Sequence, residues 1–425
     1  MGSYLGFLPK LQDFAPFKRT LRSNIGAGIT VGIVALPLAL GFAITTGAGA
    51  GAGVTTAILA GFVAALFGGS NFQVSGPTGA MTVVLVPIVT KYGVAALAPL
   101  GVFAGLLIIV MGIVKLGRFI DRVPFAVMEG FTLGIALVIA LQQIPLALGV
   151  PKAKGSHTVL VAFDTFNNAV KSSLNWKSIG LVALVLIVKF SWVKISHVLK
   201  LKFHLPASIV AIAVATVVSE ISHLHLATIG AIPKGFHAPH DFLGALKSVP
   251  MGEMVYSIIV IALLGAIESL LSARVADGMA HAQIDHEQVK HQPNRELFGQ
   301  GLGTVVASIF GGIPATGAIA RTSVNVRSGA RTRFASMVHA LFLLLVLLFL
   351  GPLVSHIPTA ALAGVLLGTS YRIANPTSIR EAMRSTWAAA LVFVVTALAV
   401  LAIDLIWGLV IGLVLHAFLK AAKRI

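Results

Sequence analysis

Apolar segments follow one another along the chain, and short polar or Gly/Pro-containing stretches separate them. A helix rises about 1.5 Å per residue, so about 20 apolar residues cross the ~30 Å hydrocarbon core of a bilayer. Most of the segments approach that length, which predicts an all-α polytopic membrane protein. The fourteen predicted segments are residues 23–44, 53–67, 79–90, 95–116, 124–143, 178–199, 205–219, 254–272, 295–310, 315–326, 334–353, 358–370, 387–402 and 404–419.

Two of these segments, 79–90 and 315–326, are too short to cross a bilayer, and each follows a Gly/Pro-rich stretch. The sequence Phe-Gly-Gly begins at Phe67 and again at Phe310, 243 positions later, upstream of the short segment in each case. The two copies are seven segments apart, an odd number, so they have opposite orientations in the membrane. Short interrupted segments at matching places of two inverted halves are typical of a transporter binding site. A chance match is the alternative, and the truncation of both matching segments argues against it.

The composition excludes several classes of protein. Of the 425 residues, 57% are hydrophobic and only 11% are charged, which is too few charges for a soluble enzyme or a disordered chain. The net charge of +17 would suggest a nucleic-acid partner in a soluble protein, but here the basic residues cluster between apolar segments. The absence of cysteine excludes disulfides, thiolate metal sites and a cysteine nucleophile.

The distribution of Lys and Arg predicts the orientation of the chain. With the N-terminus placed in the cytoplasm, 23 of the 31 basic residues fall on the cytoplasmic side and seven on the other. This asymmetry supports fourteen spans with both termini inside, and it accounts for the charge without nucleic acid. Residues 1–22 lack an apolar core, so we expect a cytoplasmic N-terminal segment rather than a cleavable signal.

The two short segments carry the first candidate chemistry. Each is a half-helix that begins near mid-membrane, where its first amide groups lack intrahelical partners and carry partial positive charge. Two such ends facing each other would bind an anion without a formal charge. Thr78 and Gly79 at one end, and Ile319 and Ala320 at the other, are the candidate substrate-binding residues. A plain helix kink is the structural alternative for each Gly/Pro stretch.

Three polar residues in otherwise apolar segments add to this hypothesis. Arg321 follows Ala320 in the second half-helix, and a charge at mid-membrane usually faces an interior cavity or a partner. We expect that partner to be Glu268, with Ser272 one turn later on the same helix face. The functional interpretation makes Arg321 an anion-attracting charge and Glu268 a proton or cation coupling site. The alternative is a structural ion pair.

Phe42 and the stretch from His281 to His291 can each be explained by ordinary packing or solvation. Phe42 lies beyond Pro37, which would break the first segment near mid-membrane, so Phe42 lines a cavity wall or simply packs. The stretch from His281 to His291 contains His, Asp and Glu, but at no spacing typical of zinc. We expect a solvated loop there and no metal site.

Several motifs of the sequence resemble those of a known family. Four stretches, residues 73–82, 268–279, 294–301 and 310–329, are similar to motifs of the SulP family, the sulfate-permease-like and prestin-type anion transporters. The resemblance covers nearly the whole chain. It implies fourteen transmembrane segments in a 7+7 inverted repeat, the uracil-permease-like fold, within a membrane transporter domain spanning residues 23–425. It also implies a core (about 23–116 and 254–353) and a gate (about 124–219 and 358–419).

The same resemblance implies roles for individual residues. Phe42 and Thr78 match substrate positions, and Ala320 and Arg321 match the pair beside the anion. Glu268 and Ser272 match positions that hold a cation in sodium-coupled bicarbonate members. Here the acid is Glu, and a fixed Arg close by is unfavourable for a cation. We therefore expect no cofactor, and a co-transported proton or simple exchange rather than sodium.

The resulting functional prediction is a secondary active transporter of small anions, working by an elevator-like movement. Sulfate, bicarbonate and C4-dicarboxylates are the candidate substrates, and a bacterial inner membrane is the expected location. The chain has no segment resembling the family's C-terminal STAS domain, so any homodimer would rest on the membrane part. An anion channel and a nucleobase–cation symporter of the same fold are the alternatives. No hydrolase, phosphate-binding or dinucleotide motif is convincing, so we expect no enzyme activity.

Overall fold

The computed structural model describes residues 4–14, 17–120, 123–155, 157–172, 174–198, 205–233, 235–238, 241–281 and 290–422. The chain separates into two compact units, each built from two stretches of sequence. Unit 1 comprises Met1–Arg122 and Gly230–Ser355, and unit 2 comprises Val123–Ile229 and His356–Ile425.

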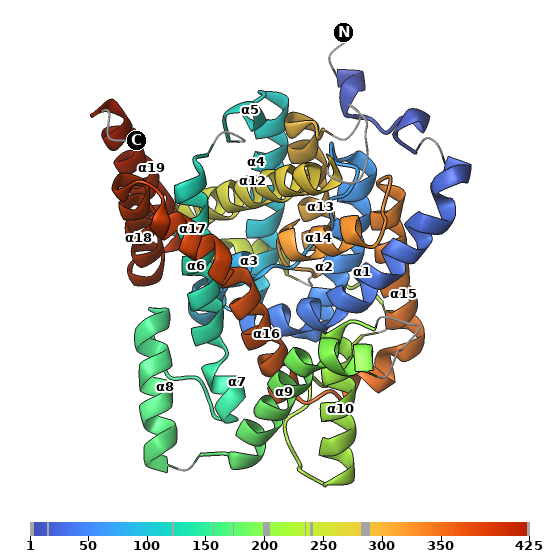
Figure 1. Ribbon diagram of the computed structural model, residues 1–425, viewed down its shortest axis with the longest axis vertical. Helices are drawn as coiled ribbons and strands as arrows, with labels where there is room; N and C mark the ends of the chain where they lie inside the picture. The colour runs from blue at the N-terminus through green and yellow to red at the C-terminus, as the bar shows by residue number, and fades with distance from the viewer. Residues whose placement is uncertain are drawn as a thin grey trace. The chain divides into compact units, whose positions relative to one another are not determined.

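Unit 1 contains the long helices that surround the two half-helices (Figure 1). Its elements are η1 (Tyr4–Phe7), η2 (Leu11–Phe14), α1 (Phe17–Thr46), α2 (Ala50–Phe67), β1 (Ser75–Gly76), α3 (Gly79–Tyr92), η3 (Val94–Ala96), α4 (Leu97–Ile113), α5 (Gly117–Ile120), α11 (Phe242–Lys247), α12 (Met251–His281), α13 (Pro293–Ile309), β2 (Thr316–Gly317), α14 (Ile319–Arg327) and α15 (Phe334–Ser355).

Small residues let the helices of unit 1 pack closely. Helix α13 lies against both α2 and α4. A Cβ on Gly105 of α4 would lie 2.8 Å from the carbonyl oxygen of Gly301, and a Cβ on Gly303 would lie 3.0 Å from that of Ala60 on α2. Such close backbone approach is the usual way in which membrane helices associate, because lipid supplies no hydrophobic driving force between them.

The regular elements in the described part of unit 2 are all helices, and an isolated β-bridge joins Thr228 to Pro358. Its helices are α6 (Phe125–Gln142), α7 (Ile144–Leu148), α8 (Thr158–Ser172), α9 (Trp176–Val198), α10 (Ala207–Ile221), α16 (Thr359–Ala374), α17 (Pro376–Arg384), α18 (Trp387–Ala402) and α19 (Leu405–Ala421). Helix α18 packs on α6 and α19, and α9 packs on α10 and α16. Lys189 of α9 is buried and donates to the Val365 carbonyl at 2.6 Å and to the Thr369 hydroxyl at 2.8 Å.

Each of the fourteen predicted segments contains one helix, but several boundaries differ. Helix α1 begins at Phe17, earlier than predicted, because its charged first turns lie outside the apolar segment. Helix α14 begins at Ile319, four residues later than predicted, because the preceding residues are extended. Helix α8 lies in the stretch 144–177, where no segment was predicted; its apolar run from Val159 to Phe163 ends at Asp164 and is too short to indicate a membrane span.

By length and composition, six helices of the described chain are suited to cross a membrane, and four shorter helices are also apolar. The six are Lys18–Thr46, Ala50–Phe67, Val94–Ile113, Phe125–Leu148, Met251–Ala280 and Phe334–Ser355. The shorter four are Gly79–Tyr92, Ala207–Ile221, Trp387–Ala402 and Leu405–Ala421.

The N-terminal turns η1 and η2 dock on helix α13. The guanidinium of Arg295 donates to both carboxylate oxygens of Asp13, at 3.0 and 2.5 Å, and to the Leu8 carbonyl at 3.2 Å. The rings of Phe7 and Phe298 lie 5.0 Å apart. Burial alone would raise the pKa of Asp13, but the hydrogen bond from Arg295, the Lys10 amide and the nearby Arg333 together lower that pKa below its ordinary value.

We expect Asp13→Asn to release this N-terminal segment. The substitution keeps the volume but removes the charge, and a hydrogen bond to a charged group is worth about 1.5–3 kcal/mol. Amide exchange of residues 4–14 should therefore rise about ten-fold or more, as measured by hydrogen–deuterium exchange mass spectrometry. Wild-type protein should show the same release as pH falls through the lowered pKa, because the stabilisation requires the ionised carboxylate. Gln12→Ala, an exposed change in the same turn, is the control; unchanged exchange in Asp13→Asn would contradict this docking.

Candidate functional site

A two-stranded crossing brings the two half-helices together. Strands β1 and β2 pair antiparallel, with Ser75 opposite Gly317 and Gly76 opposite Thr316. The Ala318 amide extends the pairing by donating to the Val74 carbonyl at 3.0 Å. Helices α3 and α14 begin within three residues of these strands. Because the strands pair, the N-terminal ends of both helices lie at the crossing.

The two helix ends differ in capping and exposure. At α3, the Thr78 hydroxyl accepts from the Met81 amide at 3.3 Å, and both Thr78 and Gly79 are buried. At α14, the N-cap Ala318 has no side chain able to cap, Ile319 is partly exposed and Ala320 is exposed. Since the first amide groups of any helix lack intrahelical partners, those of α14 are the more available to a ligand.

Glu268 of α12 lies at the junction between the two half-helices. One of its carboxylate oxygens, Oε2, accepts from the Thr78 hydroxyl at 2.9 Å and from the Thr316 hydroxyl at 2.6 Å. The two threonine oxygens are themselves 2.9 Å apart. Glu268 retains some exposed surface. We call residues 68–78, between α2 and α3, and residues 310–318, between α13 and α14, the two linkers. The carboxylate of Glu268 contacts both linkers close to the positive N-terminal ends of α3 and α14.

Neighbouring residues of α12 hold the crossing in place. The Ser269 hydroxyl accepts from the Gly317 amide at 2.9 Å. Ser272 is fully buried and donates to the Thr322 hydroxyl at 3.1 Å, and Thr322 in turn accepts from the Val74 amide at 3.0 Å. The hydroxyl of Ser272 therefore joins α12 to α14 and helps to hold the crossing in place.

Arg321 is buried and forms no direct salt bridge with Glu268, the partner predicted for it; the two charges interact at a longer distance. The Arg321 side chain is 1% exposed, and its Nη2 donates to the Pro77 carbonyl. Its Nε and Nη1 have no hydrogen-bond partner among the described residues. The guanidinium rests against the backbone of Gly76, where any Cβ would collide with Nη1, while Glu268 is engaged by the two threonines. The positive charge is therefore left without a carboxylate within ion-pair distance.

Phe42 lies close to helix α3, within the wall of unit 1. Its side chain is only 4% exposed. Its carbonyl oxygen accepts from the Thr46 hydroxyl at 2.8 Å and, at 3.5 Å, from the hydroxyl of Thr82 on α3. Phe42 therefore packs against the first turns of α3, and its role as a substrate position stays a prediction.

Several polar residues at this site were not predicted from the sequence. Thr316 stands opposite Thr78, and the signal for it was present, because Thr78-Gly79-Ala80 and Thr316-Gly317-Ala318 share the same three residue types. Gln300 of α13 contacts both linkers. His339 of α15 is fully buried, and neither of its ring nitrogens has a partner among the described residues. No local pattern distinguished Gln300 or His339 from ordinary packing residues.

In the described part of the chain, no group of three or more His, Asp or Glu residues is placed to hold a metal ion. Most of the loop between His281 and His291 lies outside the described residues. His291 itself contacts Asp277, with its Nδ1 2.7 Å from Oδ2.

Comparisons with known proteins identify the family of this chain. The family model of the sulfate permease family matches residues 21–396. A putative sulfate transporter of Bacillus subtilis, YvdB, is 36% identical over 416 residues, covering 95% of this chain and 74% of that protein. The bicarbonate transporter BicA of Picosynechococcus is 31% identical over 410 residues, covering 93% of this chain and 69% of that protein.

Solved structures show the same architecture. The transmembrane domain of a cyanobacterial bicarbonate transporter, BicA, superposes with a TM-score of 0.79 at 30% identity, covering 92% of this chain and 97% of that domain. The structure of SLC26A9 superposes with a TM-score of 0.84, covering 99% of this chain and 68% of that protein; its 17% identity supports the fold alone. With a family match over residues 21–396 and these relatives, the chain belongs to the sulfate permease (SulP) family and is a multi-pass membrane transporter rather than an enzyme.

Proposed function

We propose that the protein is a secondary active transporter that binds a small anion at the start of α14, beside Arg321 and Glu268. The observation that carries the proposal is the buried Arg321 charge, which has no carboxylate within ion-pair distance. A charge inside a membrane protein is costly unless something compensates it. An anion bound at the uncapped amides of α14 would supply that compensation.

The names of the relatives narrow the choice of anion. One is described as a putative sulfate transporter and another as a bicarbonate transporter. Both anions are small and oxygen-rich, which suits backbone amides and a guanidinium. We propose sulfate and bicarbonate as the first candidates, with C4-dicarboxylates third because a second carboxylate would need room beyond Ala320.

Coupling to protons is proposed for Glu268. In the structure its carboxylate accepts from Thr78 and Thr316, at the two linkers that would flank a bound anion. An arriving anion would place a second negative charge there, and a proton on Glu268 removes the repulsion. Ser272 donates to Thr322, so its hydroxyl hydrogen supports the fold. The positive charge of Arg321, which interacts with Glu268, disfavours a cation there, so proton coupling or exchange is proposed rather than a sodium site formed by Glu268 and Ser272.

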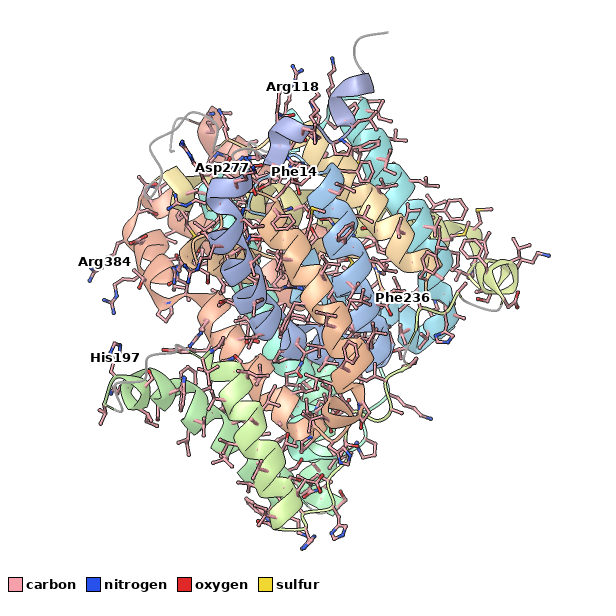
Figure 2. All side chains as sticks on the ribbon, turned by 90° about the vertical axis from the view of Figure 1, so that its right-hand side faces the viewer. Phe14, Arg118, His197, Phe236, Asp277 and Arg384 are labelled. Carbon is pink, nitrogen blue, oxygen red and sulfur yellow. The ribbon has the colours of Figure 1, made fainter. Side chains whose placement is uncertain are left out.

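The two units support an elevator-like mechanism. All the candidate residues lie in unit 1, which we propose is the moving core, and unit 2 is proposed as the gate. The antiparallel strands, each followed by a half-helix, are what a 7+7 inverted repeat of fourteen spans would produce. Figure 2 shows Phe14, Arg118 and Asp277 at one end of unit 1, away from Phe236. That end carries the N-terminal segment and is proposed to face the cytoplasm of a bacterial inner membrane.

Uptake into proteoliposomes tests the proposal. The purified protein should be assayed with labelled sulfate, bicarbonate, fumarate and chloride, with and without a pH or sodium gradient. We expect saturable uptake of at least one oxyanion, accumulation against its gradient when the pH gradient is imposed, and no response to sodium. Flux that neither saturates nor accumulates would favour the channel alternative, and uptake of uracil but of no anion would favour the nucleobase symporter.

A further inference from the structure

Helix α13 carries three polar residues that no proposed step of transport uses. Glu296, Gln300 and Thr304 are spaced four residues apart, so they lie along one face of the helix. All three are buried, Gln300 and Thr304 completely. Buried polar groups in a membrane helix are costly unless they are hydrogen-bonded, so the partners of this face indicate what it does.

The side chain of Gln300 joins the two linkers of the crossing. Its amide oxygen accepts from the hydroxyl of Ser75, the first residue of β1, at 2.7 Å. Its amide nitrogen donates to the carbonyl of Ala315, the residue directly before β2, at 2.9 Å. Both halves of the amide are therefore used, and each half holds a different linker.

The residues on either side of Gln300 each hold one linker. Glu296 accepts from the amides of Gly69 and Ser70, both at 2.8 Å, in the stretch that leads into β1. Thr304 donates to the Ala315 carbonyl at 3.2 Å, in the stretch that leads into β2. Gln300 lies between them and is the member of this face that spans both stretches.

The crossing needs such support because it is small. Each strand has two residues, and a ladder of that length is marginal without packing from other elements. Helix α13 is held firmly between α2 and α4, so it provides a rigid base. Tying both linkers to the same base helps to keep the starts of α3 and α14 at a constant separation, in addition to the contacts from α12.

We propose that Gln300 is a positioning residue that sets the separation of the two half-helix N-termini, and through it the affinity and selectivity for the anion. The inference rests on the proposed function, since it assigns a role to Gln300 in the same site. Gln300 need not touch the anion. Binding groups must be held within about 0.5 Å of their productive positions, so a small slip of one linker would weaken and redirect anion binding.

The test compares substitutions that remove different halves of the bridge. Gln300→Met keeps an unbranched side chain of similar length but neither hydrogen bond. Gln300→Glu keeps the acceptor for Ser75 and loses the donor to Ala315, and Ser75→Ala does the reverse. Ser308→Ala is the matched control, because Ser308 is one turn beyond Thr304 on the same face, buried, and its hydroxyl has no partner among the described residues.

In proteoliposome uptake, we expect Gln300→Met to raise the KM for the transported anion about ten-fold, as two lost hydrogen bonds suggest. The ratio of sulfate to bicarbonate uptake should change, whereas the maximal rate per folded transporter should change less than about three-fold. Ser75→Ala should raise KM about three-fold in the wild type and have little further effect in Gln300→Met, because the two residues share one bond. Ser308→Ala should keep the wild-type KM and ratio.

A merely structural role gives a different result. If the Gln300 variants lose only the yield of monodisperse protein, with KM and anion ratio at wild-type values, the inference is overturned. If Gln300→Met does not fold, Ser75→Ala decides, and a wild-type KM in that variant overturns the inference. Failure of the wild type to transport any anion would instead reject the proposed function, so the two failures are distinguishable.

Discussion

Arg321→Ala should lower anion uptake at sub-saturating concentration by about 100-fold or more. Truncating one member of a buried charged interaction costs about 2–5 kcal/mol, and each 1.4 kcal/mol is a factor of ten. We expect the lost interaction to be the one with the bound anion, because Arg321 donates to the Pro77 carbonyl and has no carboxylate within ion-pair distance. Initial rates in proteoliposomes, normalised to inserted protein, provide the measurement.

Two variants separate charge from geometry. Arg321→Lys keeps the charge but cannot present a planar fork, so we expect an intermediate loss. Arg327→Ala removes an exposed arginine at the end of the same helix and should leave uptake within about two-fold of the wild type. If Arg321→Ala transported every tested anion at the wild-type rate, the proposed site would be wrong.

Glu268→Gln should abolish the dependence of transport on the pH gradient while retaining anion exchange. The amide oxygen of glutamine can still accept from Thr78 and Thr316, so the crossing keeps its geometry. The side chain can no longer bind and release a proton, and uphill accumulation driven by protons should fall at least about ten-fold, since no other coupling group is assigned. Counterflow, which needs no net proton movement, should persist.

The control for this variant is Glu253→Gln, an exposed glutamate at the first turn of the same helix, which should leave the pH response unchanged. Retention of proton-driven accumulation in Glu268→Gln would assign coupling to another group. Loss of both accumulation and counterflow would show that the carboxylate is needed for anion binding itself.

Much of the helical layout was predictable from hydropathy because membrane segments must satisfy their own backbone groups. Each predicted segment contains a helix, and the two short segments are the half-helices α3 and α14. Helix α8 was missed because its apolar run, Val159 to Phe163, ends at Asp164 and is too short to indicate a membrane span. The start of α14 was placed too early because the residues before it form a strand that exists only through pairing with β1.

The sequence predicted which residues belong to the candidate site better than it predicted which residues they contact. Glu268, Thr78 and the start of α14 come together as the repeat suggested. A direct Arg321–Glu268 salt bridge does not form, because Thr316 occupies the carboxylate together with Thr78, and because Gly76 leaves room for the guanidinium elsewhere. Sequence spacing specifies which face of one helix a residue occupies, but not how that face is rotated toward another helix.

By itself, the sequence determined the membrane class of the protein and the two short, interrupted helices, because these follow from the order of apolar and polar residues along the chain. Only the tertiary structure decided which partner each buried polar group takes. Glu268 bonds to two threonines, Arg321 donates to the Pro77 carbonyl instead of forming a direct salt bridge, and Gln300 ties both linkers to α13. Those choices depend on contacts between segments up to some 240 residues apart, and the energy of such a contact depends on distance and orientation that no local pattern encodes.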